Sequence, residues 1–177
     1  ISADAERCMI DIREQAEIPE LFLQGFALCN DAVIPESGRA VGDPTEIALA
    51  VMSSNCGVRK AQTEARYPRV SEQAFDSARK MMTTVHQCRG LIAFTKGAPD
   101  VVLKRCTKIY LGGRIQPLGD LKRRRIQAAL AEMSSQALRV LALAMKEGTG
   151  DSEALLKERD LVFLGLAGMK DPIRPEA

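Results

Sequence analysis

The segment at residues 91–106 constrains the fold most, because it predicts a strand, a tight turn and a helix in direct succession. Its first five residues, LIAFT, are apolar and rich in strand-forming side chains. Gly97 permits a sharp turn because it lacks a Cβ, and Pro99 and Asp100 suit the first turn of a helix. Lys96 therefore lies at a strand end beside a helix start, where an anion can be held. The alternative is an ordinary turn with a solvated lysine.

Composition indicates one globular domain that binds no nucleic acid. The 177 residues are 46% apolar and 27% charged, which is enough for one domain with a real core. The net charge is +2, so the chain has no general basic field, and we interpret the basic run at residues 122–125 as a solvated helix start. No run of about 18 apolar residues occurs, so we expect no part of this chain to insert into a membrane.

The cysteines argue against both a disulfide framework and a zinc site. There are five, with wide spacings and no CxxC pair, and His86 is the single histidine. Unpaired thiols fit a reducing compartment. We interpret His86 as a structural residue and expect no metal ligands. Because the chain begins with Ile1 rather than Met, we expect it to be a piece of a longer protein.

Two helices are expected in the first third of the chain. Residues 19–28 carry an apolar face at helical spacing, and residues 44–53 follow Asp43, a good N-cap, and Pro44, a good first helical residue. Glu46 stands three residues after Asp43, which is the spacing of a capping box. One interpretation of Glu46 is therefore purely structural: it would close the start of its own helix. Residues 58–68 are predicted to form a short helix or a loop.

A hairpin is expected in the middle of the chain. Phe75 and residues 81–85 resemble strand pieces on either side of the polar loop 76–80, and the strand at residues 91–95 would pair back. This pairing would bring Phe75, Lys80 and Lys96 into one neighbourhood.

The second half of the chain adds further hairpin and helix signals. The expected elements are a hairpin at 108–118, a helix at 121–133, a strand at 137–145, a short helix at 152–158 and a strand at 161–169. Arg139 falls inside the apolar strand 137–145, where it requires either a partner carboxylate or an anionic ligand. Hairpins dominate over strand–helix–strand units, so the predicted fold class is α+β, a mainly antiparallel twisted sheet flanked by helices.

Six short motifs, in this order, resemble the nucleotide-binding (N) domain of P-type cation-transporting ATPases, in the subgroup that includes the calcium pumps. They are CND (29–31), GDPTEIAL (42–49), FDSARKMM (75–82), TKGAPD (95–100), LRVLA (138–142) and DPIR (171–174). Each is weak alone, but together they cover most of the chain.

The resemblance implies a role within a larger pump. The N domain of that family holds the adenine of ATP and presents the γ-phosphate to an aspartate in a DKTGT motif of the phosphorylation domain. That motif and the family's TGDGxN segment do not occur in this chain. The expected ligand is ATP, with Mg²⁺ bound mainly outside residues 1–177. The expected partners are the phosphorylation and actuator domains of the same chain, and the expected location is the cytoplasmic side of an integral membrane pump. No catalytic residue is expected here, and residues 170–177, with Asp171 and Arg174, would begin the hinge.

The resemblance also assigns site residues. Phe75 would stack on adenine, and its alternative is a place in the hydrophobic core. Glu46 would accept from the adenine amino group, and Gly97 would let the backbone approach closely. The cationic positions are Lys80 and Lys96, lining the adenine and ribose pocket, and Arg139, reaching the phosphates.

One departure from the family pattern affects the expected affinity. Many calcium pumps have an arginine two residues after the stacking phenylalanine, whereas this chain has Ser77. We therefore expect weak ATP binding with little dependence on Mg²⁺, and we favour calcium as the transported ion. The alternatives are a non-catalytic nucleotide-binding or regulatory module of the same fold, and a structural interaction domain whose motifs only pack.

Overall fold

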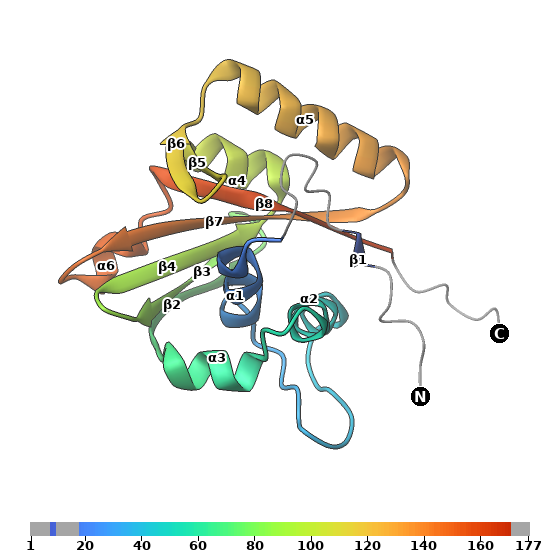
Figure 1. Ribbon diagram of the computed structural model, residues 1–177, viewed down its shortest axis with the longest axis vertical. Coiled ribbons are helices and arrows are strands. Elements are labelled where there is room, and N and C mark those ends of the chain that lie inside the picture. The colour runs from blue at the N-terminus through green and yellow to red at the C-terminus, as the bar shows by residue number, and fades with distance from the viewer. Residues whose placement is uncertain (1–7, 10–17, 171–177) are drawn as a thin grey trace.

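The computed structural model describes residues 8–9 and 18–170 and shows a twisted sheet with helices on both faces (Figure 1). The strand order is β2-β3-β4-β7-β8-β5-β6, and β1 also pairs with β8. The strands are β1 Cys8–Met9, β2 Arg69–Asp76, β3 Met81–Gln87, β4 Leu91–Gly97, β5 Cys106–Leu111, β6 Arg114–Pro117, β7 Arg139–Gly148 and β8 Leu161–Met169. The helices are α1 Glu20–Leu28, α2 Pro44–Asn55, α3 Lys60–Arg66, α4 Pro99–Arg105, α5 Asp120–Ser135 and α6 Ser152–Leu155.

The α+β fold class is confirmed. All neighbouring strands pair antiparallel except β5 and β8, which run parallel. The strand–turn–helix at residues 91–106 is present as β4 and α4, with Pro99 as the first helical residue. The expected hairpins are β2–β3–β4 and β5–β6. Of the expected hinge at 170–177, all but residue 170 lies outside the described residues.

The two larger of three hydrophobic clusters in the described residues lie on opposite faces of the sheet. On one face, α1, α2 and α3 cover a core that contains Phe22, Phe26 and Phe94, whereas α4 and α5 cover a second core on the other face (Figure 1). Helix α1 lies directly on the strands, because a Cβ at Gly25 would be 2.6 Å from the Leu143 side chain. The central strands β3, β4, β7 and β8 are therefore largely buried on both sides, whereas the edge strands β2 and β6 are mostly exposed.

One end of the sheet gathers the segments that the sequence singled out. Residue pairs Met81↔Gly97 and Gly97↔Ala142 join the start of β3, the end of β4 and the start of β7 at this end. The end of β2 meets the start of β3 through the pair Asp76↔Met81.

The expected position of Arg139 inside a buried strand is wrong. Arg139 is the first residue of β7, and it is exposed. The reason is local: α5 ends at Ser135, and Ala137 adopts a left-handed conformation with φ 54°, so extended pairing begins two residues later than predicted. Because the Arg139 guanidinium is on an exposed residue, its charge does not require a buried counter-charge.

Candidate functional site

The start of α2 positions Glu46. The Asp43 carboxylate accepts a hydrogen bond from the Thr45 N–H at 2.9 Å, so Asp43 caps the helix as predicted. Glu46 does not complete a capping box. Its carboxylate accepts from the Asp31 N–H at 3.0 Å and pairs with Lys96 on β4. The carboxylate is thus turned away from its own helix end and towards the sheet.

Lys96 is a buried lysine, so the alternative of a solvated turn lysine is wrong. It is 6% exposed, and its ammonium is ion-paired with the Glu46 carboxylate. Lys96 lies opposite Met82 on β3 and Leu143 on β7, on the face covered by α1 and α2. The pair therefore joins the sheet to α2 at the strand end.

Gly97 allows the backbone of the preceding turn to come close. A Cβ at Gly97 would lie 2.3 Å from the Lys80 carbonyl oxygen and 2.6 Å from the Met81 Cβ. The same Lys80 carbonyl accepts from the Ala98 N–H at 3.0 Å. Lys80 itself has φ 59° and an exposed side chain. The chain from Lys96 to Ala98 is therefore held against the turn that precedes β3.

The turn between β2 and β3 presents Phe75. This residue is 63% exposed, so the alternative that it is a core phenylalanine is wrong. The adjacent Asp76 carboxylate accepts from the N–H groups of Ala78 and Arg79, each at 2.8 Å. Both hydrogen bonds lower the pKa of Asp76, and the bond from the Arg79 N–H has the larger effect. The turn is therefore closed by a carboxylate that stays ionised. A well-ordered polar turn therefore carries an exposed aromatic ring at its entrance.

The side chain of Arg139 is hydrogen-bonded to the start of α2. Its Nη1 donates to the Thr45 hydroxyl at 2.9 Å. Thr45 directly precedes Glu46, so the start of β7 and the start of α2 lie side by side.

The structure thus places all six sequence-predicted residues at one end of the sheet, on four neighbouring segments. Glu46 and Lys96 are in direct contact, and Gly97 contacts Lys80 through the backbone. Arg139 reaches the same helix start through Thr45, the chain neighbour of Glu46, and Phe75 lies near the end of β2.

Asn30 is a residue that the sequence reasoning did not assign. It is fully buried, its Nδ2 donates to the Glu46 carbonyl at 2.8 Å, and its Oδ1 accepts from the Ala32 N–H at 2.9 Å. The turn-forming pair Asn30-Asp31 was visible in the sequence, but its contact with α2 was not, since 16 residues separate Asn30 from Glu46.

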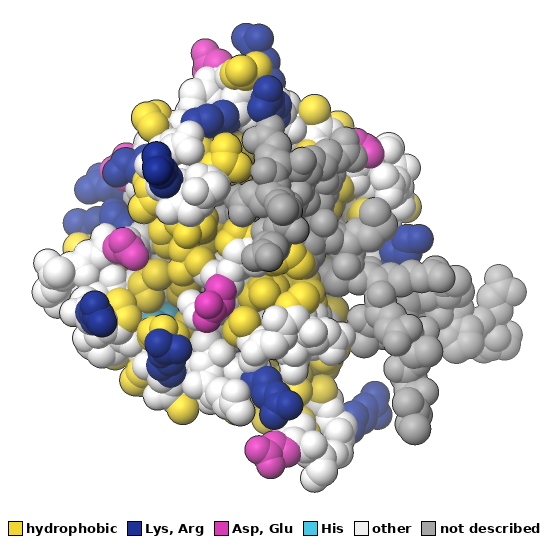
Figure 2. Space-filling model, in the orientation of Figure 1, with side chains coloured by type: hydrophobic (Ala, Val, Ile, Leu, Met, Phe, Trp, Pro, Cys, Tyr) yellow, Lys and Arg dark blue, Asp and Glu magenta, His cyan; other side chains and the backbone are white. Residues whose placement is uncertain are grey.

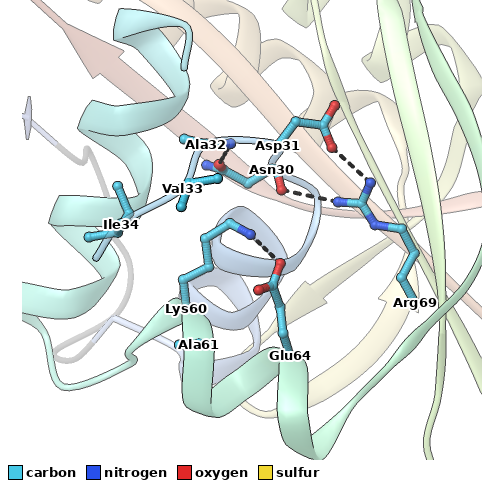
Figure 3. A pocket seen from close by; sticks show the side chains of 9 residues that line it. All are labelled: Asn30, Asp31, Ala32, Val33, Ile34, Lys60, Ala61, Glu64 and Arg69. Atoms are coloured by element: carbon cyan, nitrogen blue, oxygen red, sulfur yellow. Dashed lines mark hydrogen bonds and ion pairs between the residues drawn. The ribbon is translucent and has the colours of Figure 1, made fainter. Parts of the chain in front are cut away.

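A cavity of about 350 Å³ lies next to this corner, between residues 30–34, α3 and Arg69 (Figure 3). Its charged side chains neutralise each other. Arg69 donates to Asp31 at 2.7 Å, and Lys60 is paired with Glu64 within α3. The cavity is therefore polar but balanced in charge.

The visible face of the molecule shows no single charged field. Figure 2 shows Lys and Arg side chains in several separate places, with Asp and Glu between them and hydrophobic side chains exposed towards the middle. Within residues 8–9 and 18–170, no three His, Cys, Asp or Glu side chains group closely enough to hold a metal ion. None of the described helices is long and apolar enough to cross a membrane.

Comparison with known proteins places this chain in a known class. A family profile described as "P-type ATPase, cytoplasmic domain N" matches residues 20–176. The chain belongs to this family.

The relatives are individual cation pumps. The chain is 41% identical over 162 residues to calcium-transporting ATPase 1 of Bacillus cereus, covering 90% of this chain and 18% of that protein. It is 38% identical over 174 residues to a calcium-transporting ATPase of Bacillus subtilis, covering 94% of this chain and 19% of that protein. A third relative, calcium-transporting ATPase 1 of Lactococcus lactis, is 37% identical over 158 residues, covering 88% of this chain and 18% of that protein. The chain therefore spans about a fifth of the length of these relatives.

Proposed function

We propose that this chain is the ATP-binding domain of a calcium-transporting P-type ATPase. The observation that carries the proposal is the exposure of Phe75, 63% of the residue, at the strand end that also holds Lys80, Gly97 and the Glu46–Lys96 pair. A large exposed aromatic ring beside polar and cationic groups suits a nucleobase, because stacking supplies affinity and hydrogen bonds at the base edge supply orientation.

Each predicted residue has a role that its place supports. Phe75 stacks on adenine, which contributes about 1–3 kcal/mol by analogy with base stacking elsewhere. Glu46 accepts from the adenine amino group, and Lys96 pairs with that carboxylate and orients it. Lys80 borders the ribose, and Gly97 leaves room beside it. Arg139, beside the start of α2, contacts the phosphates.

The role in the whole pump follows from the family. The bound ATP would be presented to an aspartate in a phosphorylation domain outside this chain, and the actuator domain of the same protein would be the second partner. We place this domain on the cytoplasmic side of an integral membrane protein. We expect the chain alone not to hydrolyse ATP, because it contains no DKTGT motif.

The affinity should be weak and nearly independent of Mg²⁺. Ser77 stands where many calcium pumps have an arginine, so one cationic contact with the nucleotide is missing. Mg²⁺ would reach this domain with the ATP phosphates and find its protein ligands elsewhere in the pump.

An ATP titration of the 177-residue chain followed by ¹H–¹⁵N NMR tests the proposal. We expect the amide resonances of Phe75, Lys96 and Gly97 to shift at millimolar ATP, with or without Mg²⁺. Phe75→Ala should abolish these shifts while the remaining spectrum stays dispersed. Ile115→Ala is the matched control, because Ile115 is also an exposed apolar residue but lies on β6, at the opposite edge of the sheet. Unshifted resonances at millimolar ATP would refute the proposed function.

A further inference from the structure

A β-bulge near the end of β2 determines how Phe75 is presented. The pairing of β2 with β3 is regular at Glu72↔Thr84 and Gln73↔Thr83, and it resumes at Asp76↔Met81. Ala74 and Phe75 therefore lie opposite Met82 alone, a count of two residues against one. Such a bulge redirects a side chain and leaves backbone groups without their regular ladder partners.

The Arg79 side chain supplies a partner at this bulge. Its Nη2 donates to the Ala74 carbonyl at 2.8 Å and to the Met81 carbonyl at 2.9 Å. Ala74 directly precedes Phe75, and Met81 begins β3. One guanidinium group therefore bridges the two strands across the turn that carries the ring.

Glu158 fixes the orientation of that guanidinium group. Its carboxylate is almost completely buried and accepts from Arg79 Nε at 3.1 Å. The other carboxylate oxygen accepts from the Thr83 hydroxyl at 2.9 Å, and Thr83 is in turn 2.9 Å from the Thr95 hydroxyl. Glu158 is thus tied to β3 as well as to Arg79, so the arginine cannot rotate away without leaving a buried carboxylate unpaired.

We infer that Arg79, held by Glu158, is a positioning residue for the nucleotide: it maintains the bulge that directs Phe75 towards the base. The inference rests on the proposed ATP site. It requires an arginine, because donation from Nη2 and Nε in fixed directions needs the planar guanidinium fork, and a lysine offers one flexible ammonium instead. Arg79 touches neither base nor phosphate in this role and acts through Phe75.

A double-mutant cycle on ATP affinity separates this role from a general effect on charge or stability. Arg79→Lys keeps the charge, and we expect it to weaken ATP binding by about tenfold, the loss typical of a broken charge-assisted contact. Phe75→Leu retains an apolar group but stacks poorly. In the Phe75→Leu background, Arg79→Lys should change the affinity by less than about twofold, because its effect passes through the ring. Arg114→Lys, an exposed arginine on β6, is the matched control and should leave the affinity unchanged.

Three further measurements make each outcome decisive. Binding of inorganic tripolyphosphate, which lacks the base, should be equal in the wild type and Arg79→Lys; an equal loss for tripolyphosphate and ATP would overturn the inference. Glu158→Gln should reproduce the Phe75-dependent loss even if Arg79→Lys fails to fold. In the absence of nucleotide, Arg79→Lys should shift the Ala74 and Phe75 amide resonances, and unchanged resonances would overturn the role at the bulge.

A wild-type chain that does not bind ATP would overturn the proposed function and the nucleotide role together, whereas ATP binding with an additive cycle would overturn the role of Arg79 alone.

Discussion

The ammonium group of Lys96 on β4 is paired with the carboxylate of Glu46 on α2, and 50 residues of chain separate the two. Both side chains are mostly shielded from water, with 7% of Lys96 and 14% of Glu46 exposed. The pair is the main polar link between the sheet and α2 at the proposed nucleotide site. Its integrity should therefore matter for stability as well as for binding.

Removing one charge of this pair should be costly. Glu46→Gln leaves the buried Lys96 ammonium without its counter-charge, and we expect the free energy of unfolding to fall by about 3 kcal/mol. Urea denaturation followed by circular dichroism measures this loss. Glu72→Gln is the control, because Glu72 is half-exposed and its partner Arg69 keeps Asp31, so its cost should stay under about 1 kcal/mol. The double variant Glu46→Gln/Lys96→Met should recover part of the stability. Equal losses of stability for Glu46→Gln and Glu72→Gln would contradict the importance of the buried pair.

Gly97→Ala should destabilise the strand end by about 2 kcal/mol or more, because the new Cβ meets backbone rather than a side chain that can move aside. The clash is with the Lys80 carbonyl at 2.3 Å and with Met81, which also anchor the turn below Phe75. Gly119→Ala provides the comparison, since a Cβ there meets no atom within 4 Å. Thermal unfolding of both variants gives the measurement. A Gly97→Ala variant as stable as Gly119→Ala would show that the close approach is not tight in solution.

His86 should make the stability of this domain depend on pH. The ring is fully buried in β3, and burial lowers the pKa of His86 from 6.5 to about 4. Nδ1 lies 3.0 Å from the Tyr67 carbonyl, which can only accept, so Nδ1 carries the proton and Nε2 accepts from the Thr84 hydroxyl. The folded chain therefore holds the neutral ring.

The direction of the effect follows from that shift. Between pH 6.5 and pH 4 the unfolded chain binds a proton that the folded chain does not, so the free energy of unfolding falls as the pH is lowered. The expected loss attributable to His86 is about 2 kcal/mol between pH 7 and pH 5, and above pH 7 there is none. His86 is the only histidine, so Glu/Asp titration can be subtracted by comparing the wild type with His86→Gln in urea at each pH. Parallel pH profiles for the two proteins would contradict the assignment.

The sequence predicted those parts of the fold that have local causes. Gly97 and Pro99 marked the end of β4 and the start of α4, Asp43 marked the start of α2, and the polar loop between Phe75 and residues 81–85 marked the β2–β3 hairpin. The family motifs predicted six site residues, all of which lie at one end of the sheet. These signals depend on a few adjacent residues, so they can be read without knowing the fold.

Long-range contacts were not predictable in the same way. Lys96 was expected to be solvated or to bind an anion, because Glu46 is distant in sequence, and nothing near Arg79 indicated that Glu158, 79 residues later, would hold it. The parallel pairing of β5 with β8 joins segments that give no mutual signal. Arg139 was misplaced because the left-handed conformation of Ala137 has no signature in the residue type.

Arg139 should distinguish the phosphates of the nucleotide from its base. Its guanidinium lies at the start of β7 and donates to Thr45 at the start of α2, whereas Phe75 lies on β2, with β3 and β4 between the two strands. Arg139→Gln should weaken ATP binding by about tenfold, since a charge-assisted contact to phosphate is lost, but it should leave adenosine binding unchanged. Phe75→Leu should weaken both ligands by the same factor, which makes it the internal control for base recognition. Isothermal titration or NMR titration of each variant with ATP and adenosine gives the comparison. An Arg139→Gln variant that loses adenosine affinity as strongly as ATP affinity would place Arg139 in the support of the fold, through Thr45 and α2, instead of at the phosphates.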